Sequence, residues 1–296
     1  MVVATGFFDG VHLGHRRVIA GLVRAAQERG TESLVLTFWP HPRTVLQKDA
    51  AGLRLLSSPE EKKAMLTALG VDRVEVLEFT KEFSRMTAEH YLREIIIGKY
   101  GGTAVLLGYD NRLGSDGADT EEVARTAKSL GLEVIRIEAL QEADVTVSST
   151  KIRAALAAGD VALASRMLGY DYSLRGAVVS GNGFGRKLGF PTANMRLYEP
   201  LKMIPGNGVY AVRVEVLGRQ LYGMTNIGLR PTVTHDTVPV IETNIFDFDE
   251  QIYGLDINIS FLAKMRDEVR FGSVDELKVQ LAKDRELCLK NVQSAQ

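Results

Sequence analysis

Two histidines three residues apart, His12 and His15, stand in the glycine-rich stretch 6–15, Gly-Phe-Phe-Asp-Gly-Val-His-Leu-Gly-His. A short apolar run at 2–5 precedes this stretch, and apolar residues repeat at helical spacing over 16–27. A helix start presents unpaired N–H groups and the positive end of the helix dipole, which together bind anions. The pattern therefore favours a phosphate site flanked by both imidazoles over two surface histidines at a turn. The glycines expected to let the backbone approach the phosphate are Gly6, Gly10 and Gly14.

A second candidate anion site lies at 147–153, Val-Ser-Ser-Thr-Lys-Ile-Arg, immediately before a predicted helix that ends near Ala158. Hydroxyl groups at a helix start often do no more than cap it, and capping alone is the simpler alternative. Lys151 and Arg153 stand one turn further along and supply more donors than a cap requires. Together the two motifs would hold a triphosphate. The hydroxyls concerned are Ser148, Ser149 and Thr150.

Alternating strand and helix patterns position both motifs. This alternation predicts a doubly wound parallel sheet, which binds ligands at the carboxyl ends of its strands. Two strand ends carry suitable residues, Trp-Pro-His-Pro at 39–42 and Gly-Tyr-Asp-Asn-Arg at 108–112. The predicted strands are 2–5, 33–38, 72–78, 104–107 and 133–137, and the predicted helices are 16–27, 60–69, 87–99 and 120–130.

The pattern changes after a helical connector at 159–171, where β-rich segments replace the βα units. We predict a small antiparallel barrel closed by a helix at 274–291, whose apolar stripe of Leu277, Leu281 and Leu287 covers an open end. The predicted domains are 1–158 and 172–296. The predicted barrel strands are 172–179, 208–216, 220–226, 238–246 and 255–264.

A glycine-rich stretch at 181–194 lies between the first two predicted barrel strands and matches neither a Walker loop nor a dinucleotide fingerprint. Its glycines still permit folding over phosphates, although a flexible barrel loop is the alternative. Pro191 fixes the chain before Thr192 and Asn194, whose oxygens suit a hard cation such as Mg²⁺. The candidate phosphate-binding residues are Gly181, Gly183, Gly185, Arg186, Lys187 and Gly189.

Composition limits the class of protein. The 36 Lys and Arg balance 37 Asp and Glu, which disfavours nucleic acid as the main partner. The lone Cys288 excludes a disulfide framework and fits a cytoplasmic protein. No apolar run approaches the roughly 20 residues that cross a membrane. Five residues precede Gly6, so we expect either a trimmed start or an unusually exposed first strand; the oligomeric state stays open.

The first half resembles class I nucleotidyltransferases in His12-Leu-Gly-His15 with 148–153, and 37–42 is similar to the FAD synthetase module of bacterial bifunctional riboflavin kinase/FAD synthetases. The resemblance implies that the FMN phosphate attacks the α-phosphorus of ATP and releases pyrophosphate. It implies that both histidines hold ATP phosphates. It further implies pyrophosphate binding by Ser148, Ser149, Thr150 and Arg153, ATP binding by Gly6, Phe7 and Gly14, and flavin binding by Phe38, Pro40, His41 and Asp110.

The second half is similar to the riboflavin kinase domain, on the stretches 185–194, 224–232, 241–243 and 266–271. This resemblance implies that Thr192 and Asn194 bind Mg²⁺ with the nucleotide, that Glu242 activates the riboflavin 5′-hydroxyl, and that the glycines of 181–194, Lys187 and Pro191 bind phosphate. Two departures are Asn244, where a histidine is common, and 108–119, where Leu113 replaces a common phenylalanine.

These features predict a bifunctional enzyme that makes FMN from riboflavin and then FAD from FMN, using ATP and Mg²⁺ in both steps. Its expected partners are the small molecules riboflavin, FMN and ATP, without a nucleic acid or a membrane. Two alternatives stay open. One is a riboflavin kinase with a weakened adenylyltransferase half, motivated by 108–119, and the other is a non-catalytic flavin-binding regulator.

Overall fold

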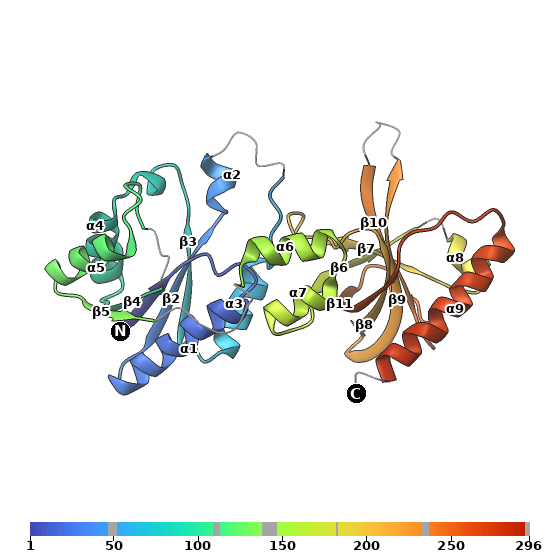
Figure 1. The fold of residues 1–296 in the computed structure, drawn as a ribbon, viewed down its shortest axis with the longest axis horizontal. Helices are drawn as coiled ribbons and strands as arrows, with labels where there is room; N and C mark the ends of the chain where they lie inside the picture. The colour runs from blue at the N-terminus through green and yellow to red at the C-terminus, as the bar shows by residue number, and fades with distance from the viewer. Residues whose placement is uncertain (47–51, 109–112, 138–146, 182, 232–236, 294–296) are drawn as a thin grey trace. The chain divides into compact units, whose positions relative to one another are not determined.

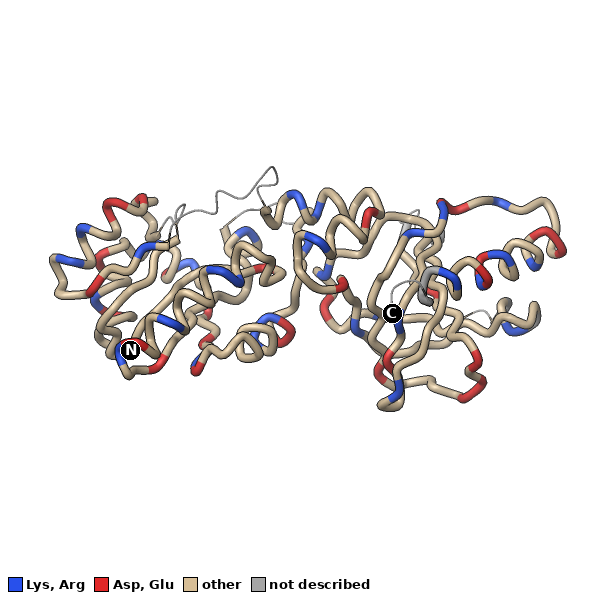
Figure 2. The backbone as a smooth tube through the Cα atoms, turned by 60° about the horizontal axis from the view of Figure 1, so that its bottom comes forward, with Lys and Arg blue, Asp and Glu red and all other residues tan. Residues whose placement is uncertain are grey.

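The computed structural model describes residues 1–46, 52–108, 113–137, 147–181, 183–231 and 237–293. Contacts divide the chain into two compact units, Met1–Ser149 and Thr150–Gln296. Helices α6 (Ser149–Ala157) and α7 (Val161–Leu168) thus fall almost wholly in the second unit, although the sequence analysis assigned 1–158 to the first domain. Lysine, arginine and acidic residues are interspersed along both units (Figure 2).

The first unit is built on a parallel sheet with the strand order β3-β2-β1-β4-β5 (Figure 1). The central strand β1 is buried, with Val2, Val3 and Ala4 at most 1% exposed, so the expectation of an exposed first strand was wrong. The strands are β1 (Val2–Thr5), β2 (Ser33–Trp39), β3 (Arg73–Glu78), β4 (Ala104–Leu107) and β5 (Glu133–Arg136).

Helices cover both faces of this sheet. Alternate residues of β1 point to opposite faces, so Val2 packs with the apolar residues of α1 and α3 whereas Val3 packs with those of η2 and α5. Capping boxes at Ser58 and Asp119 start α3 and α5. The helices are α1 (Leu13–Glu28), α2 (Pro42–Leu46), α3 (Pro59–Ala68), the 3₁₀ turn η1 (Phe83–Arg85), α4 (Ala88–His90), the π-helical η2 (Tyr91–Lys99) and α5 (Thr120–Ser129).

The second unit contains a closed antiparallel barrel with the strand order β10-β7-β6-β11-β8-β9. The sequence analysis missed β7 and treated 181–194 as one loop, because the strand is short and begins with Ala193-Asn194. Pairing with β6 and β10 makes it a strand. The strands are β6 (Ser173–Val179), β7 (Ala193–Leu197), β8 (Gly208–Val216), β9 (Arg219–Pro231), β10 (Thr237–Ile245) and β11 (Asp256–Arg266), and the short helix α8 is Phe184–Lys187.

Helix α9 (Val274–Gln293) packs against β8, β9 and β11. Its predicted apolar stripe was wrong at Leu287, which is 48% exposed; the buried face instead includes Asp284 and Cys288. Asp284 lies three residues after Leu281, and Cys288 lies four residues after Asp284, so the three residues share one helix face. No helix among the described residues is long and apolar enough to cross a membrane. The predicted fold class, a doubly wound sheet followed by a barrel with a closing helix, is confirmed.

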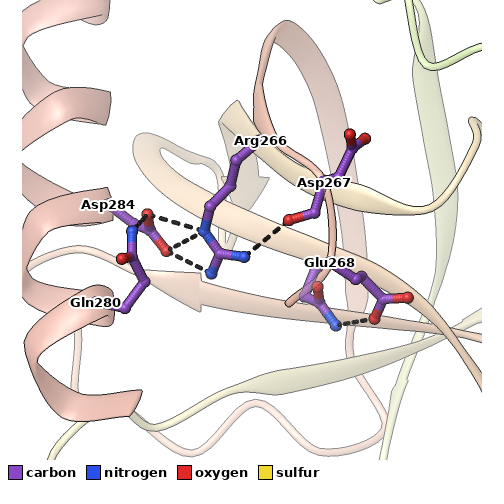
Figure 3. Close-up of polar contacts among 6 residues, drawn as sticks. Arg266, Asp267, Glu268, Gln280 and Asp284 are labelled. Atoms are coloured by element: carbon purple, nitrogen blue, oxygen red, sulfur yellow. Dashed lines mark hydrogen bonds and ion pairs between the residues drawn. The ribbon is translucent and has the colours of Figure 1, made fainter. Parts of the chain in front are cut away.

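A buried ion pair fixes α9 to β11 (Figure 3). Arg266 Nη2 donates to Asp284 Oδ2 at 2.7 Å, and Arg266 Nε lies 3.1 Å from both carboxylate oxygens. Gln280 Nε2 also donates to Asp284 Oδ1 at 2.8 Å, so the carboxylate is fully engaged. The Asp284 side chain is 4% exposed and that of Arg266 is 20% exposed. Loss of either partner would leave the other charge desolvated and unpaired.

We therefore predict that Asp284→Ala lowers the unfolding free energy of the barrel unit by about 3 kcal/mol, the low end for a broken buried pair because Arg266 keeps some solvent contact. Amide hydrogen exchange of α9 measures the change. Arg175→Ala is the matched control, because it breaks a surface pair with Asp256 in which both side chains are 60% exposed. That control should cost less than about 1 kcal/mol. Equal losses in the two variants would contradict the prediction.

Candidate active sites

The turn between β1 and α1 brings the two histidines into ring contact. His12 is the N-cap residue of α1, and its Nδ1 accepts a hydrogen bond from His15 N at 3.3 Å. In the neutral ring the proton is then on Nε2, which leaves that atom as a donor. The imidazoles stack with centroids 3.6 Å apart and an interplanar angle of 16°. Capping thus fixes His12 in the orientation that places it against His15.

The turn's glycines serve it in different ways. Gly10 has a φ of +77°, which favours glycine. At Gly14 a Cβ would lie 3.2 Å from His12 Cε1, and at Gly6 it would lie 3.1 Å from the Phe8 ring. Gly6 and Gly14 therefore make room for neighbouring rings, a role that the sequence analysis did not anticipate. The turn also holds Phe8 at φ +47° and Val11 at φ +36°, strained values for residues with a Cβ.

Asp9 anchors the turn to the segment before α3. Its carboxylate accepts hydrogen bonds from Leu56 N, Ser57 N and Ser57 Oγ at 3.0 to 3.3 Å. Ser57 Oγ in turn accepts from Gly10 N at 3.0 Å. Ser149 Oγ donates to Asp9 O at 3.1 Å, so the structure brings the start of the second anion motif onto the turn.

The remaining residues of that motif divide between the units. Ser148 belongs to the same unit as the turn. Thr150, Lys151 and Arg153 lie beyond its boundary at Ser149, on the first turns of α6. Their participation in a phosphate site with the histidines stays a prediction.

His15 is held as a neutral ring. Burial, together with smaller contributions from His12 and Lys62, lowers its pKa to about 3. Its Nδ1 is buried and has no hydrogen-bond partner among the described residues. A buried polar atom without a partner is costly unless a ligand or water satisfies it. The ring is thus prepared to bond a group that enters the turn.

An aromatic cavity of about 540 Å³ opens at the carboxyl ends of β1, β2 and β4. Three of the residues that line it were predicted to belong to a site: Gly6, Phe7 and Phe38. The sequence analysis missed three further lining residues, Phe79, Phe83 and Tyr91. Phe79 directly follows β3, so its place at a strand end was the available signal. A planar, largely apolar ligand suits these walls.

Of the predicted flavin-binding residues that the structure describes, Phe38 lines this cavity, whereas Pro40 and His41 are not among its lining residues. The His41 ring packs on Phe7 with centroids 4.7 Å apart, outside the residues that line the cavity. Pro40 follows Trp39 through a cis peptide bond at the end of β2. Asp110 lies outside the described residues.

The unusual stretch 113–119 forms an ordered part of the cavity wall. Leu113 N donates to Ala118 O at 3.1 Å, and Ser115 N donates to Met86 O at 2.8 Å. Asp116 Oδ1 accepts from Ala88 N at 3.1 Å, and Asp119 caps α5. The stretch 113–119, which departs from the family pattern, thus forms a turn that hydrogen bonds attach to α4.

A cavity of about 440 Å³ in the barrel unit gathers the predicted kinase residues. The register of three antiparallel strands sets Asn194 on β7 and Asn226 on β9 directly opposite Glu242 on β10. Directly opposed residues share a face of the sheet, and all three line this cavity with Thr192. The other walls are mostly apolar: Phe190, Val209, Met224, Phe271, Leu277 and Leu281.

The glycine-rich stretch before β7 packs closely on these polar residues. A Cβ at Gly181 would lie 2.2 Å from Asn194 Nδ2, and one at Gly185 would lie 2.4 Å from Phe190 O. Gly183 and Gly189 have φ values of +65° and +84°. The stretch includes the helical turn α8, so it is a folded segment; the side chain of Lys187 lies outside the described residues.

A second barrel cavity, of about 360 Å³, shares Thr192 with the first. Arg186 and Pro191 line it beside Phe248, Asp249 and other residues that follow β10. Thr192 therefore lies between two cavities: Glu242, Glu268 and Arg266 line the first, and Arg186, Asp249 and Glu250 line the second.

Asn244 and Glu268 are site residues whose roles the sequence analysis did not identify. Asn244 is buried, lines the 440 Å³ cavity, and its Nδ2 donates to Pro191 O at 2.7 Å. Glu268 lines the same cavity and accepts from Asn226 Nδ2 at 3.4 Å (Figure 3). Asn244 lies two residues from Glu242, and this spacing along a strand was the signal for a shared face.

The described residues contain no cluster of three or more His, Cys, Asp or Glu side chains able to hold a metal. Thr192 and Asn194 offer hard oxygen donors at one cavity instead. That donor set fits Mg²⁺, which usually binds through few protein oxygens together with substrate phosphates and water.

Comparisons with known proteins identify both halves. The FAD synthetase family model matches residues 1–151, and the riboflavin kinase family model matches residues 168–292. A solved structure described as a macrolide-efflux protein from Streptococcus pneumoniae has a TM-score of 0.90 at 32% identity, over 97% of this chain and 93% of that chain. That likeness shows a shared fold.

Curated relatives match over nearly the whole chain. The bifunctional riboflavin kinase/FMN adenylyltransferase of Bacillus subtilis is 37% identical over 96% of this chain and 90% of its own length. The protein of the same name from Escherichia coli is 35% identical over the same shares. The chain therefore belongs to the family of bifunctional riboflavin kinase/FMN adenylyltransferases.

Proposed function

We propose that this chain phosphorylates riboflavin to FMN in its barrel and adenylylates FMN to FAD on its parallel sheet, with ATP and Mg²⁺ in both steps. For the kinase, the proposal rests on Asn194 and Glu242, which lie opposite each other on paired strands and line one cavity. A second cavity shares Thr192 with the first. For the adenylyltransferase, it rests on the stacked imidazoles at the start of α1. We place both reactions in the cytoplasm, in keeping with the lone Cys288.

In the kinase step, the flavin ring occupies the 440 Å³ cavity against its apolar walls, and the nucleotide occupies the 360 Å³ cavity near Arg186. Glu242 accepts the proton of the riboflavin 5′-hydroxyl as that oxygen attacks the γ-phosphorus, and ADP leaves. Thr192 and Asn194 hold Mg²⁺, which when bound neutralises phosphate charge. The glycine-rich stretch packs on Asn194 and keeps it facing the reacting groups.

In the adenylyl step, the flavin of FMN occupies the aromatic cavity, and its phosphate attacks the α-phosphorus of ATP. Pyrophosphate is the leaving group, so the protein needs no covalent intermediate. Donors aimed at the phosphoryl oxygens stabilise the charge that builds in the transition state. His12 Nε2 and His15 supply such donors, and Ser148, Ser149, Thr150 and Arg153 bind the departing pyrophosphate.

A time course of riboflavin, FMN and FAD with wild-type protein tests the proposal against its alternatives. Formation of FMN without FAD would favour a kinase with a weakened first half. Binding of flavin without either product would favour a regulator. The anchored stretch 113–119 favours the bifunctional enzyme, because it completes the wall of the aromatic cavity.

Glu242→Gln should lower kcat for riboflavin phosphorylation by about 10²- to 10⁴-fold, because an amide cannot accept the hydroxyl proton. FAD synthesis from supplied FMN should stay within about twofold of wild type, since the first unit has its own site. Separate assays of the two steps measure both rates. Retained kinase activity would remove Glu242 from the mechanism.

His15→Ala should lower FAD formation from FMN by about 10²- to 10³-fold, since the imidazole donor is lost. Kinase activity from the same chain should be unchanged, and amide hydrogen exchange of β1 and α1 is the control for folding of the first unit. Wild-type FAD synthesis in this variant would count against the role of the imidazole pair.

Asn244→Asp should lower kcat/KM of the kinase by about tenfold, because an ionised carboxylate cannot donate to Pro191 O and repels it. Asn244→His is the matched variant, since an imidazole N–H can still donate to that carbonyl. It should retain most of the activity. Equal kinetics in the two variants would show that the hydrogen bond has no part in positioning Thr192.

A further inference from the structure

Lys62 is a buried cation in the first unit that the proposed mechanism does not use. It lies on α3 and is 5% exposed, on the same helix face as the buried Leu66. An apolar side chain would fill this position without losing the hydration of an ammonium group. A lysine here therefore needs a reason beyond packing.

The ammonium group is connected to the phosphate turn through two hydrogen bonds. Lys62 Nζ donates to Thr37 Oγ1 at 3.1 Å. Thr37, buried near the end of β2, donates through the same Oγ1 to Phe7 O at 3.2 Å. Nζ also lies 5.8 Å from the centroid of the Phe7 ring, within reach of a cation–π interaction. Lys62 thus joins α3 and β2 to the residue that begins the turn.

The charge of Lys62 also acts on the titratable groups of the turn. Burial lowers the pKa of Lys62, and the negative charge of Asp9 opposes that effect. The positive charge of Lys62 and that of His12 add to burial in lowering the pKa of His15. The ammonium therefore helps to keep the His15 ring neutral in the protein without substrate, while adding positive potential for an incoming polyphosphate.

We propose that Lys62 is a positioning residue of the adenylyltransferase site, which holds Phe7 in place through Thr37 and supplies a buried positive charge beside the Phe7 ring. This inference rests on the proposed function of the first unit. Lys62 acts through the turn and does not contact the reacting atoms. A purely structural lysine, by contrast, would be replaceable by an apolar side chain of similar length without effect on catalysis.

Lys62→Met tests the inference, because methionine fills a similar volume without a charge or a donor. FAD formation from FMN should fall by about tenfold or more in kcat/KM, since misplaced phosphate donors are costly. Riboflavin phosphorylation by the same chain should stay within about twofold and reports folding of the barrel unit, while amide hydrogen exchange of β1 and α1 reports folding of the first unit. Thr37→Val separates the two roles: it breaks the link to Phe7 O but keeps the ammonium, and should lower FAD formation as well.

A titration of the imidazole resonances by NMR provides a readout independent of turnover. His15 should take up its proton at a higher pH in Lys62→Met than in wild type, because a neighbouring positive charge is gone. In Thr37→Val its titration should match that of wild type, because the charge remains. An unchanged titration of His15 in Lys62→Met would show that the charge of the ammonium group does not act on the turn.

The inference is overturned if Lys62→Met keeps wild-type FAD kinetics and the wild-type titration of His15. If that variant also loses exchange protection in the first unit, its fold is damaged and Thr37→Val decides; wild-type FAD kinetics in Thr37→Val would then overturn the inference. A wild-type protein that makes no FAD refutes the proposed function instead, and the His15 titrations still test the charge of Lys62.

Discussion

The hydrogen bonds of the Asp9 carboxylate are the interaction on which the phosphate turn depends. A turn of irregular backbone beside a buried strand cannot pair its polar groups within a helix or a sheet, and unpaired buried groups are costly. Asp9 satisfies two N–H groups of the segment before α3, while the hydroxyl of Ser57 accepts from Gly10 N. With the turn held at Asp9 and Gly10, the strained φ of Val11 and the stacked imidazoles can persist.

The barrel meets the same requirement with an amide. The glycine-rich stretch has little regular pairing of its own, and Asn244 bonds Pro191 O just before the predicted magnesium ligands. Strand register then places Asn194 directly opposite Glu242. Each site thus contains a segment of irregular backbone that one side chain ties to a neighbouring segment: Asp9 of the turn itself in the first unit, and Asn244 of β10 in the barrel.

Electrostatics distinguish the two sites. In the first unit, buried cationic groups crowd together, and burial with mutual repulsion keeps His15 uncharged. Phosphate oxygens entering the turn would reverse that balance, because negative charge stabilises imidazolium and ammonium. In the barrel, the carboxylates of Glu242 and Glu268 and the amides of Asn194, Asn226 and Asn244 line a largely apolar cavity, a set suited to accept a proton and hold a cation.

The sequence by itself determined the alternation of strands and helices, the change to a barrel, and the motifs at His12–His15 and 181–194, because these follow from local spacing and composition. It also placed Glu242 and Asn194 in one family pattern. Local spacing could not show β7, whose strand conformation comes from its neighbours, nor the buried face of α9 at Asp284, where a charge occupies an otherwise apolar stripe. Only tertiary structure brings Lys62 to Thr37, which bonds Phe7 O, and brings Asn244 to Pro191 O, since these partners lie far apart in the sequence.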